Sequence, residues 1–293
     1  MQSGRTSGQG AIEPPFGAHA LPPVLEGLRR FGAALPRGWL ARRLTSLIRR
    51  VCVAGRTGPF DVEPFPGQRA RLYPQDNLSE KRVFGAPQFW DWAERAAVAE
   101  AMAAAPRPFR FVDAGANAGL YTLAVRSLGP ADVLAIEPDA ENLRRLEVNL
   151  DASGAEDVRV CAAALSDRPG TARLGGAGNR GERALGADGD GGDEVPTLPL
   201  LAALEGTGWD RLDALKIDIE GAEAPVLAAY LRDAPAGFWP GLVILEAQRG
   251  ESTRALELLL DAGYLLAERT RMNAILTLPA AQAEAGAGPR RRN

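Results

Sequence analysis

The sequence contains one histidine and two cysteines, and both shortages limit the chemistry of the protein. His19 lies in a leader rich in proline and glycine. A general base elsewhere in the chain must therefore be a carboxylate, Lys216, a tyrosine or water. Cys52 and Cys161 are far apart in sequence, which argues against a disulfide and against a cysteine-based metal site.

Long apolar runs are also missing. None approaches the roughly 20 residues that span a bilayer, and the N-terminus lacks the basic-then-apolar order of a signal peptide, so we expect a cytoplasmic protein. Residues 1–56 carry nine arginines against two glutamates, whereas the remainder is acidic, and we expect no nucleic-acid partner. We interpret the basic arm as a solvated helical extension, with weak contact to a membrane surface or a protein as the alternative.

A glycine turn in residues 111–122 (FVDAGANAGLYT) carries the strongest signal. It predicts a strand, a tight turn and the start of a helix, and Glu137 closes the next apolar run. This pattern indicates a nucleoside-binding crevice, in which the glycines let the ligand approach the backbone and the carboxylate takes the ribose hydroxyls. The turn does not match G-x-G-x-x-G, and the chain has no phosphate-binding lysine loop (G-x-x-x-x-G-K-[ST]), which argues against a dinucleotide. Asp113 before the turn suits a cationic ligand such as S-adenosylmethionine.

The order of predicted elements indicates an α/β fold. We expect a doubly wound, mostly parallel, seven-stranded, Rossmann-like sheet with an antiparallel edge strand, because a three-residue link joins the last two strands. The predicted strands are 109–113, 132–137, 157–164, 212–218, 241–247, 264–269 and 273–278, and the predicted helices of this part lie near 119–128, 139–151, 222–232 and 251–262.

The chain divides into four predicted regions: a basic, partly disordered or helical extension (1–56), a lead-in hairpin and helix packed on the core (57–106), the catalytic domain (107–278) and a disordered tail (279–293). Within the first region we expect disorder over 1–20 and helices at 21–35 and 39–53. The hairpin should join 61–63 to 68–73, before a helix at 91–105. Residues 168–194, rich in glycine, alanine and aspartate, are predicted to be a mobile loop beside the cleft.

A second acidic motif lies at residues 213–223 (DALKIDIEGAE). Ligands of open α/β sheets bind at the carboxyl ends of strands, so Asp218 and Glu220 should face substrate and cofactor. Lys216 on the buried strand should be paired with an acid. Helix capping by Asp218 or Glu220 is the structural alternative, but it does not explain the lysine.

These motifs together make the chain resemble the FkbM family of class I S-adenosylmethionine-dependent methyltransferases. The resemblance covers roughly residues 60–278, and its matching segments are 71–84, 112–122, 136–150, 160–167, 212–227 and 242–247. One departure is Pro199, which follows Thr197-Leu198 where many members carry an aspartate. A role of that aspartate in substrate contact or helix capping is therefore not expected here.

The resemblance implies O-methylation of a hydroxyl on a sugar, glycolipid or secondary metabolite, with S-adenosyl-L-methionine as cofactor. The methionine end of the cofactor should meet Asp113, Gly115, Asn117 and Gly119. Glu137, followed by Pro138, should bind the ribose, and the loop from Ala163 through Ala164 to Asp167 should flank the adenine. Asn77, Ser79 and Glu80 should close over the site.

Catalysis is assigned to Asp218, Glu220 and Lys216, with Asp218 or Glu220 as the base. No metal is expected, although a magnesium ion held by these acids is an alternative. Three other functions stay open: an RNA methyltransferase, a non-catalytic scaffold that binds S-adenosylmethionine, and a nicotinamide oxidoreductase.

Overall fold

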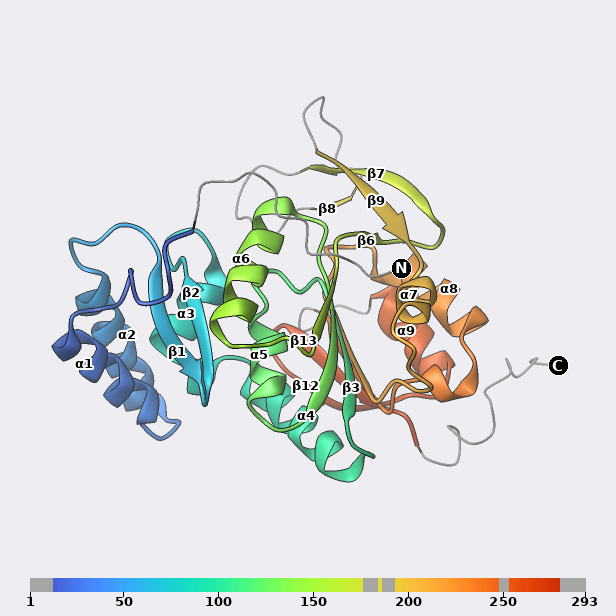
Figure 1. Cartoon of the computed structure of the whole chain (residues 1–293). Helices are drawn as coiled ribbons and strands as arrows, with labels where there is room; N and C mark the ends of the chain where they lie inside the picture. Colours follow the sequence, from blue (N-terminus) through green and yellow to red (C-terminus); the bar gives the residue numbers. More distant parts are fainter. Residues whose placement is uncertain (1–12, 176–183, 186–192, 248–252, 280–293) are drawn as a thin grey trace.

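A mostly parallel sheet of seven strands forms the centre of the protein (Figure 1). The structure is a computed structural model that describes residues 13–175, 184–185, 193–247 and 253–279. Across the sheet the strands are β12 (Leu265–Arg269), β13 (Asn273–Thr277), β11 (Leu242–Glu246), β10 (Ala214–Ile217), β3 (Phe109–Ala114), β4 (Ala131–Ile136) and β5 (Val158–Cys161). Among these strands only β13 runs in the opposite direction to the rest; it pairs antiparallel with both β11 and β12, and its hairpin with β12 completes that edge. The predicted fold class is confirmed.

Helices cover both faces of the sheet (Figure 1). On one face lie α4 (Trp92–Ala104), α5 (Leu120–Arg126) and α6 (Ala140–Ala152), and on the other α7 (Leu200–Glu205), α8 (Glu223–Asp233) and α9 (Arg254–Asp261). Successive strand residues point to opposite faces, so Phe111 packs in the first core and Val112 in the second. Apolar side chains on both faces explain why these strands read as continuous apolar runs.

The N-terminal part packs on the first core. It contains α1 (Pro23–Ala34), α2 (Trp39–Val53), the hairpin of β1 (Phe60–Phe65) and β2 (Gln68–Leu72), α3 (Leu78–Gly85) and a short 3-10 turn, η1 (Pro87–Phe89). Ile48 and Cys52 of α2 share one apolar cluster with Phe60 and Phe84. Helix α3 was not predicted; the Asn77 side chain caps it by accepting hydrogen bonds from two backbone N–H groups.

Asp61 holds the leader against this hairpin. Its buried carboxylate accepts hydrogen bonds from the backbone N–H groups of Gly17 (2.7 Å) and His19 (3.1 Å) and from Arg71. Residues 13–20 were expected to be disordered, and this clamp is the physical reason for the difference. Residues 1–12 and 280–293, for which disorder was also expected, lie outside the described residues.

A second, four-stranded sheet lies where a mobile loop was predicted, at the top of Figure 1. Its order is β6 (Ala164–Leu165), β9 (Asp193–Leu198), β7 (Gly170–Gly175) and β8 (Ala184–Leu185). The predicted strand 157–164 is divided, because β6 leaves the main sheet to pair in parallel with β9. The loop prediction is wrong for the parts of 168–194 in these strands, and 176–183 and 186–192 are outside the described residues.

Within the described part of the chain, every helix is too short or too polar to cross a membrane. Helix α7 begins after Pro199 without a side-chain cap, as expected from the absence of an aspartate there.

Candidate active site

A cavity of about 310 Å³ opens at the carboxyl ends of β3, β4, β10 and β11. It brings together most of the site residues predicted from the sequence, namely Asp113, Gly115, Asn117, Glu137, Pro138, Ala164, Lys216, Asp218 and Glu220, with Asn77 and Ser79 from the N-terminal side. Gly119, Asp167 and Glu80 do not line it. Residues of both motifs line this cavity, although the motifs are about a hundred residues apart in the chain.

Contacts within the protein explain the glycines of the turn. Gly115 and Gly119 have φ angles of 78° and 80°, which favour glycine. A Cβ on Gly115 would overlap the backbone carbonyl of Asp218, and one on Gly119 would overlap the Leu146 side chain. These glycines therefore permit contact between protein segments, whereas the sequence suggested contact with a ligand. Gly119 faces α6 and not the cavity.

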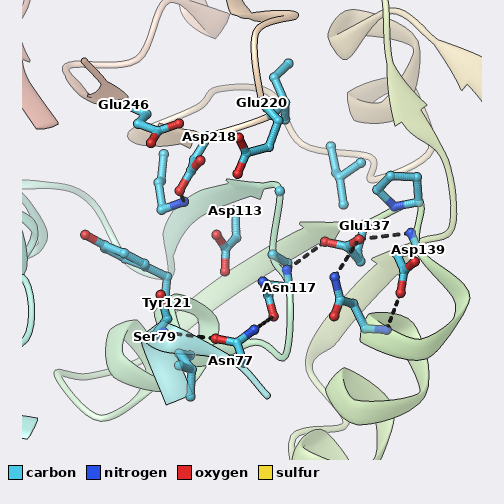
Figure 2. A pocket seen from close by; sticks show the side chains of 18 of the residues that line it. Asn77, Ser79, Asp113, Asn117, Tyr121, Glu137, Asp139, Asp218, Glu220 and Glu246 are labelled. Atoms are coloured by element: carbon cyan, nitrogen blue, oxygen red, sulfur yellow. Dashed lines mark hydrogen bonds and ion pairs between the residues drawn. The ribbon is translucent and has the colours of Figure 1, made fainter. Parts of the chain in front are cut away.

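Asn117 links three parts of the site. Its backbone N–H donates to Glu137 Oε2 at 2.7 Å, and its side-chain oxygen accepts a hydrogen bond from Asn77 Nδ2 at 3.0 Å (Figure 2). Its φ of 52° is in the left-handed region, which asparagine tolerates better than most residues. The contact with Asn77 connects the lead-in region to the glycine turn.

Glu137 lies just after β4 and is 5% exposed. Its Oε1 accepts from the Asp139 backbone N–H at 2.9 Å, and Asp139 in turn caps α6 (Figure 2). Burial raises the pKa of Glu137 to about 7, although these hydrogen bonds oppose the rise. Oε1 also accepts a hydrogen bond from Asn142 Nδ2 at 3.4 Å, whereas Oε2 keeps a lone pair beyond its bond to the Asn117 N–H and can accept a hydroxyl from a ligand.

Asp113 is fully buried at the end of β3. Its Oδ2 accepts hydrogen bonds from the backbone N–H (3.0 Å) and the hydroxyl (2.8 Å) of Thr122. Among the described residues, no group bonds to its Oδ1. Burial raises the pKa of Asp113, and the charge of Lys216 opposes this shift. A buried carboxylate oxygen that lines the cavity without a protein partner suits a ligand that donates hydrogen bonds or carries positive charge.

Three carboxylates gather at the other side of the cavity (Figure 2). The oxygens of Asp218, Glu220 and Glu246 lie within 4.8 Å of one another. Lys216 Nζ is 3.0 Å from Asp218 Oδ2, so the predicted lysine partner is confirmed. Burial would raise the pKa of Asp218, but Lys216 and a hydrogen bond from Glu246 hold it below its usual value. Burial and the negative charge of Asp218 raise the pKa of Glu246 to about 9, so Glu246 carries the shared proton at neutral pH.

Neither acid of the second motif caps the following helix. The N-cap of α8 is Ala222, which makes no side-chain cap bond, and Glu223 accepts hydrogen bonds from the backbone N–H groups of Ile219 and Gly221. The capping alternative is therefore excluded for Asp218 and Glu220.

Two predicted site residues have other surroundings. Glu80 is completely buried, where its carboxylate pairs with Arg145 at 2.9 Å and accepts from the Tyr73 backbone N–H at 2.6 Å. It connects α3 to α6 and does not close over the cavity. Asp167 is exposed and accepts a hydrogen bond from the neighbouring Ser166 hydroxyl. Ala163 and Ala164 of the same segment line the cavity, whereas Asp167 follows β6 and does not.

The family profile described as Methyltransferase FkbM domain matches residues 113–266. The chain belongs to the FkbM methyltransferase family. The match starts at Asp113 and extends into β12, so it contains both motifs and all three clustered carboxylates. No curated protein matches this FkbM methyltransferase.

Several solved methyltransferase structures are similar to this FkbM-family chain. The precorrin-6y C5,15-methyltransferase of Geobacter metallireducens is 17% identical over 62% of this chain and 85% of its own, with a TM-score of 0.41. The ribosomal protein L11 methylase of Lactobacillus delbrueckii is 15% identical over 63% and 78%, with a TM-score of 0.39. A SAM-dependent methyltransferase of Agrobacterium tumefaciens is 10% identical over 75% and 69%, with a TM-score of 0.43.

Glu246 is the main site residue of this FkbM methyltransferase that the sequence prediction missed. It ends β11, which pairs in parallel with β10, so it lies beside Asp218. Asp218 was predicted because ligands of open α/β sheets bind at the carboxyl ends of strands, and the same argument applies to Glu246. With Glu246 the cluster has three oxygen donors, which is the ligand type that magnesium and calcium prefer. The nearby ammonium of Lys216 already neutralises part of this charge.

Tyr121 and Asp91 also line the cavity and were not predicted. The Tyr121 hydroxyl donates to Asp91 Oδ2 at 2.7 Å, and Lys216 Nζ lies 4.9 Å from the centre of the tyrosine ring. Tyr121 belongs to the glycine turn motif of residues 111–122, but its position in that sequence did not indicate that its ring would lie beside Lys216.

Proposed function

We propose that the protein transfers the methyl group of S-adenosylmethionine to a hydroxyl of a sugar, glycolipid or secondary metabolite. One observation carries the proposal: a single cavity contains Glu137 after β4, the buried Asp113 at the end of β3 and the ionised Asp218 after β10. This arrangement offers acceptors for ribose hydroxyls and negative charge for an ammonium or sulfonium group.

The proposed reaction is an in-line displacement at the sulfonium methyl carbon. The acceptor oxygen forms a bond to this carbon while the carbon–sulfur bond breaks, and the electron pair of that bond leaves a neutral thioether, S-adenosylhomocysteine. The protein mainly aligns the reacting atoms. Asp218 is the proposed base, because it is ionised at neutral pH while Glu246 carries a proton beside it. The hydroxyl proton passes to the Asp218 carboxylate.

The donor half of the proposal is tested by calorimetric titration with S-adenosylhomocysteine. Glu137→Gln should weaken binding by more than about tenfold, because hydrogen bonds to a charged group contribute roughly 1.5–3 kcal/mol. Since the pKa of Glu137 is about 7 in the free protein, wild-type binding should strengthen between pH 6 and 8 as the carboxylate ionises. The Glu137→Gln variant should lack this pH dependence. Glu147→Gln, which does not line the cavity, is the control. Failure of the wild type to bind the ligand would reject the proposed cofactor.

The transfer half is tested with radioactive methyl-labelled S-adenosylmethionine and extracts of glycans and small metabolites. Asp218→Asn should lower the rate of labelling by about 10²–10⁴, the usual contribution of a positioned base. Its affinity for S-adenosylhomocysteine should change little, because that product has no sulfonium charge. Wild-type labelling by Asp218→Asn would show that another group takes the proton.

A further inference from the structure

A second cavity of about 590 Å³ adjoins the first. The two share a wall formed by Leu78, Arg82, Trp90, Asp91 and Met272. The remaining walls come largely from α2, α3, the start of α4 and the turn between β12 and β13. Because the second cavity shares a wall with the one that holds the acidic cluster, and none of the predicted donor residues lines it, it is placed to hold the molecule that receives the methyl group. This step rests on the proposed function.

Basic side chains dominate the second cavity. Five of them line it: Arg42, Arg49, Lys81, Arg82 and Arg271. Within the described ranges, none of the five forms an ion pair with an acid. Arg49 is partly buried, and the other four are exposed at the rim of the cavity. Five cations without an acidic partner around one cavity give it a positive potential that would attract an anionic ligand.

Three acids also line this cavity, and two of them already bond to protein groups. Asp91 accepts the Tyr121 hydroxyl, and Glu94 accepts hydrogen bonds from Thr270 and Asn273 at 2.7 Å. The third, Glu268, is exposed on β12. Cations thus outnumber acids, and the buried acids are directed to other partners.

Aromatic rings complete the lining. Phe89, Trp90 and Trp92 line the cavity, and the Arg42 guanidinium lies 4.8 Å from the centre of the Phe89 ring. Flat apolar rings beside fixed cations suit a ligand with both an apolar or sugar ring and a charged group.

We propose that this second cavity binds the methyl acceptor, and that the acceptor is a hydroxyl compound carrying a phosphate or diphosphate. One arginine guanidinium group can donate two parallel hydrogen bonds to the oxygens of a phosphate, and the Lys81 ammonium adds a compact positive charge. The phosphate lies among the cations of α2, α3 and the β12–β13 turn, and the hydroxyl reaches Asp218 past the shared wall. The phosphate takes no part in the transfer, so bonds and protons change as in the displacement described above.

The test uses the full chain saturated with S-adenosylhomocysteine, so that the donor cavity is filled. Calorimetric titrations are made with inorganic pyrophosphate, glucose 1-phosphate and glucose. Both phosphate probes should bind, glucose should not, and the affinity should fall with rising ionic strength. Arg49→Gln and Arg271→Gln should each weaken phosphate binding by at least about tenfold, since one charged hydrogen bond contributes roughly 1.5–3 kcal/mol. Arg271 is exposed, so its substitution leaves folding intact.

Arg50→Gln is the matched control. Arg50 follows Arg49 on α2 and is exposed, but it does not line the cavity, and its substitution should change phosphate binding less than twofold. Equal losses in Arg50→Gln and Arg49→Gln, equal binding of glucose and glucose 1-phosphate, or no phosphate binding would each overturn this inference. The proposed function would survive any of these results provided that S-adenosylhomocysteine still binds, so the two failures are distinguishable.

Discussion

Gly115 shows how one missing side chain sets the geometry of the site. Its hydrogen atom lets the glycine turn approach the backbone carbonyl of Asp218, so the ends of β3 and β10 come together. The turn after β3 and the acidic motif are therefore positioned by contact with each other. A ligand is not needed to explain the glycine.

A comparison of two glycines tests this explanation. Gly115→Ala should lower the free energy of unfolding by about 1–2 kcal/mol because of its left-handed backbone. The overlap with Asp218 should lower it by about 1–3 kcal/mol more. Gly154→Ala shares the positive φ but has open space around the added carbon, so only the first cost applies. Urea unfolding measures both free energies. Equal losses in the two variants would show that the contact with Asp218 does not constrain the turn.

At the scale of elements, parallel pairing of β10 and β11 places acids side by side. Ile217 pairs with Leu245, so the next residues, Asp218 just after β10 and Glu246 at the end of β11, lie side by side. Because the pKa of Glu246 is raised to about 9, the folded state holds a proton that the unfolded state releases near pH 4.5. The folded state therefore loses stability as pH rises through this interval.

The pH dependence of unfolding tests this pair. Between pH 7 and 9, above the pKa of Glu137, the free energy of unfolding of the wild type should fall. Glu246→Gln keeps a neutral side chain and should reduce this slope, whereas Glu205→Gln, at an exposed site on α7, should keep it. Chemical denaturation at several pH values measures the slopes. Parallel curves for wild type and Glu246→Gln would mean that the two acids do not share a proton.

The strand-end acids explain why much of this site was predictable. Asp113 lies at the end of a strand, and Glu137 and Asp218 directly follow strands of apolar residues; parallel strands bring such positions to one edge of a sheet. The directions of side chains within turns were not predictable, since they depend on backbone angles set by tertiary contacts. Gly119 therefore faces α6, and Glu80 is buried against Arg145.

The main sheet and its helices were predictable from the sequence, whereas the four-stranded sheet was not, and the difference has a physical cause. Buried strands and amphipathic helices leave periodic patterns, but the four-stranded sheet contains short segments rich in small or polar residues. Strand β6 has two residues and pairs with β9, far along the chain. Such pairing leaves no local pattern that a sequence can show.

At the scale of the whole molecule, a buried ion pair holds the leader, residues 13–20, against the β1–β2 hairpin. Arg71 is 2% exposed and pairs with Asp61, which also holds the backbone of the leader. Burial would raise the pKa of Asp61, but Arg71 and the backbone N–H groups keep it below its usual value. The stability that this carboxylate adds is present above its unfolded pKa and is lost as pH falls through its folded pKa.

Removing this carboxylate should destabilise the protein. Asp61→Ala leaves a buried arginine without its main partner and should cost about 3–5 kcal/mol. Asp157→Ala removes the partner of Arg126 at a surface where Asp157 is 44% exposed, and should cost no more than about 1 kcal/mol. Urea unfolding gives both values, and hydrogen exchange should show faster exchange at Gly17 and His19 only in Asp61→Ala. Similar small losses in both variants would contradict a clamp at this junction.

The two cavities are lined by different elements of the fold, which bears on how their linings can change. The donor residues follow strands whose positions are fixed by the packing of the whole sheet, whereas α2, α3 and the β12–β13 turn supply most of the second cavity. Surface arginines on those elements can be exchanged without disturbing strand order. Exchanges in these outer segments would therefore alter the proposed acceptor cavity and leave the strand-end residues of the proposed donor cavity in place.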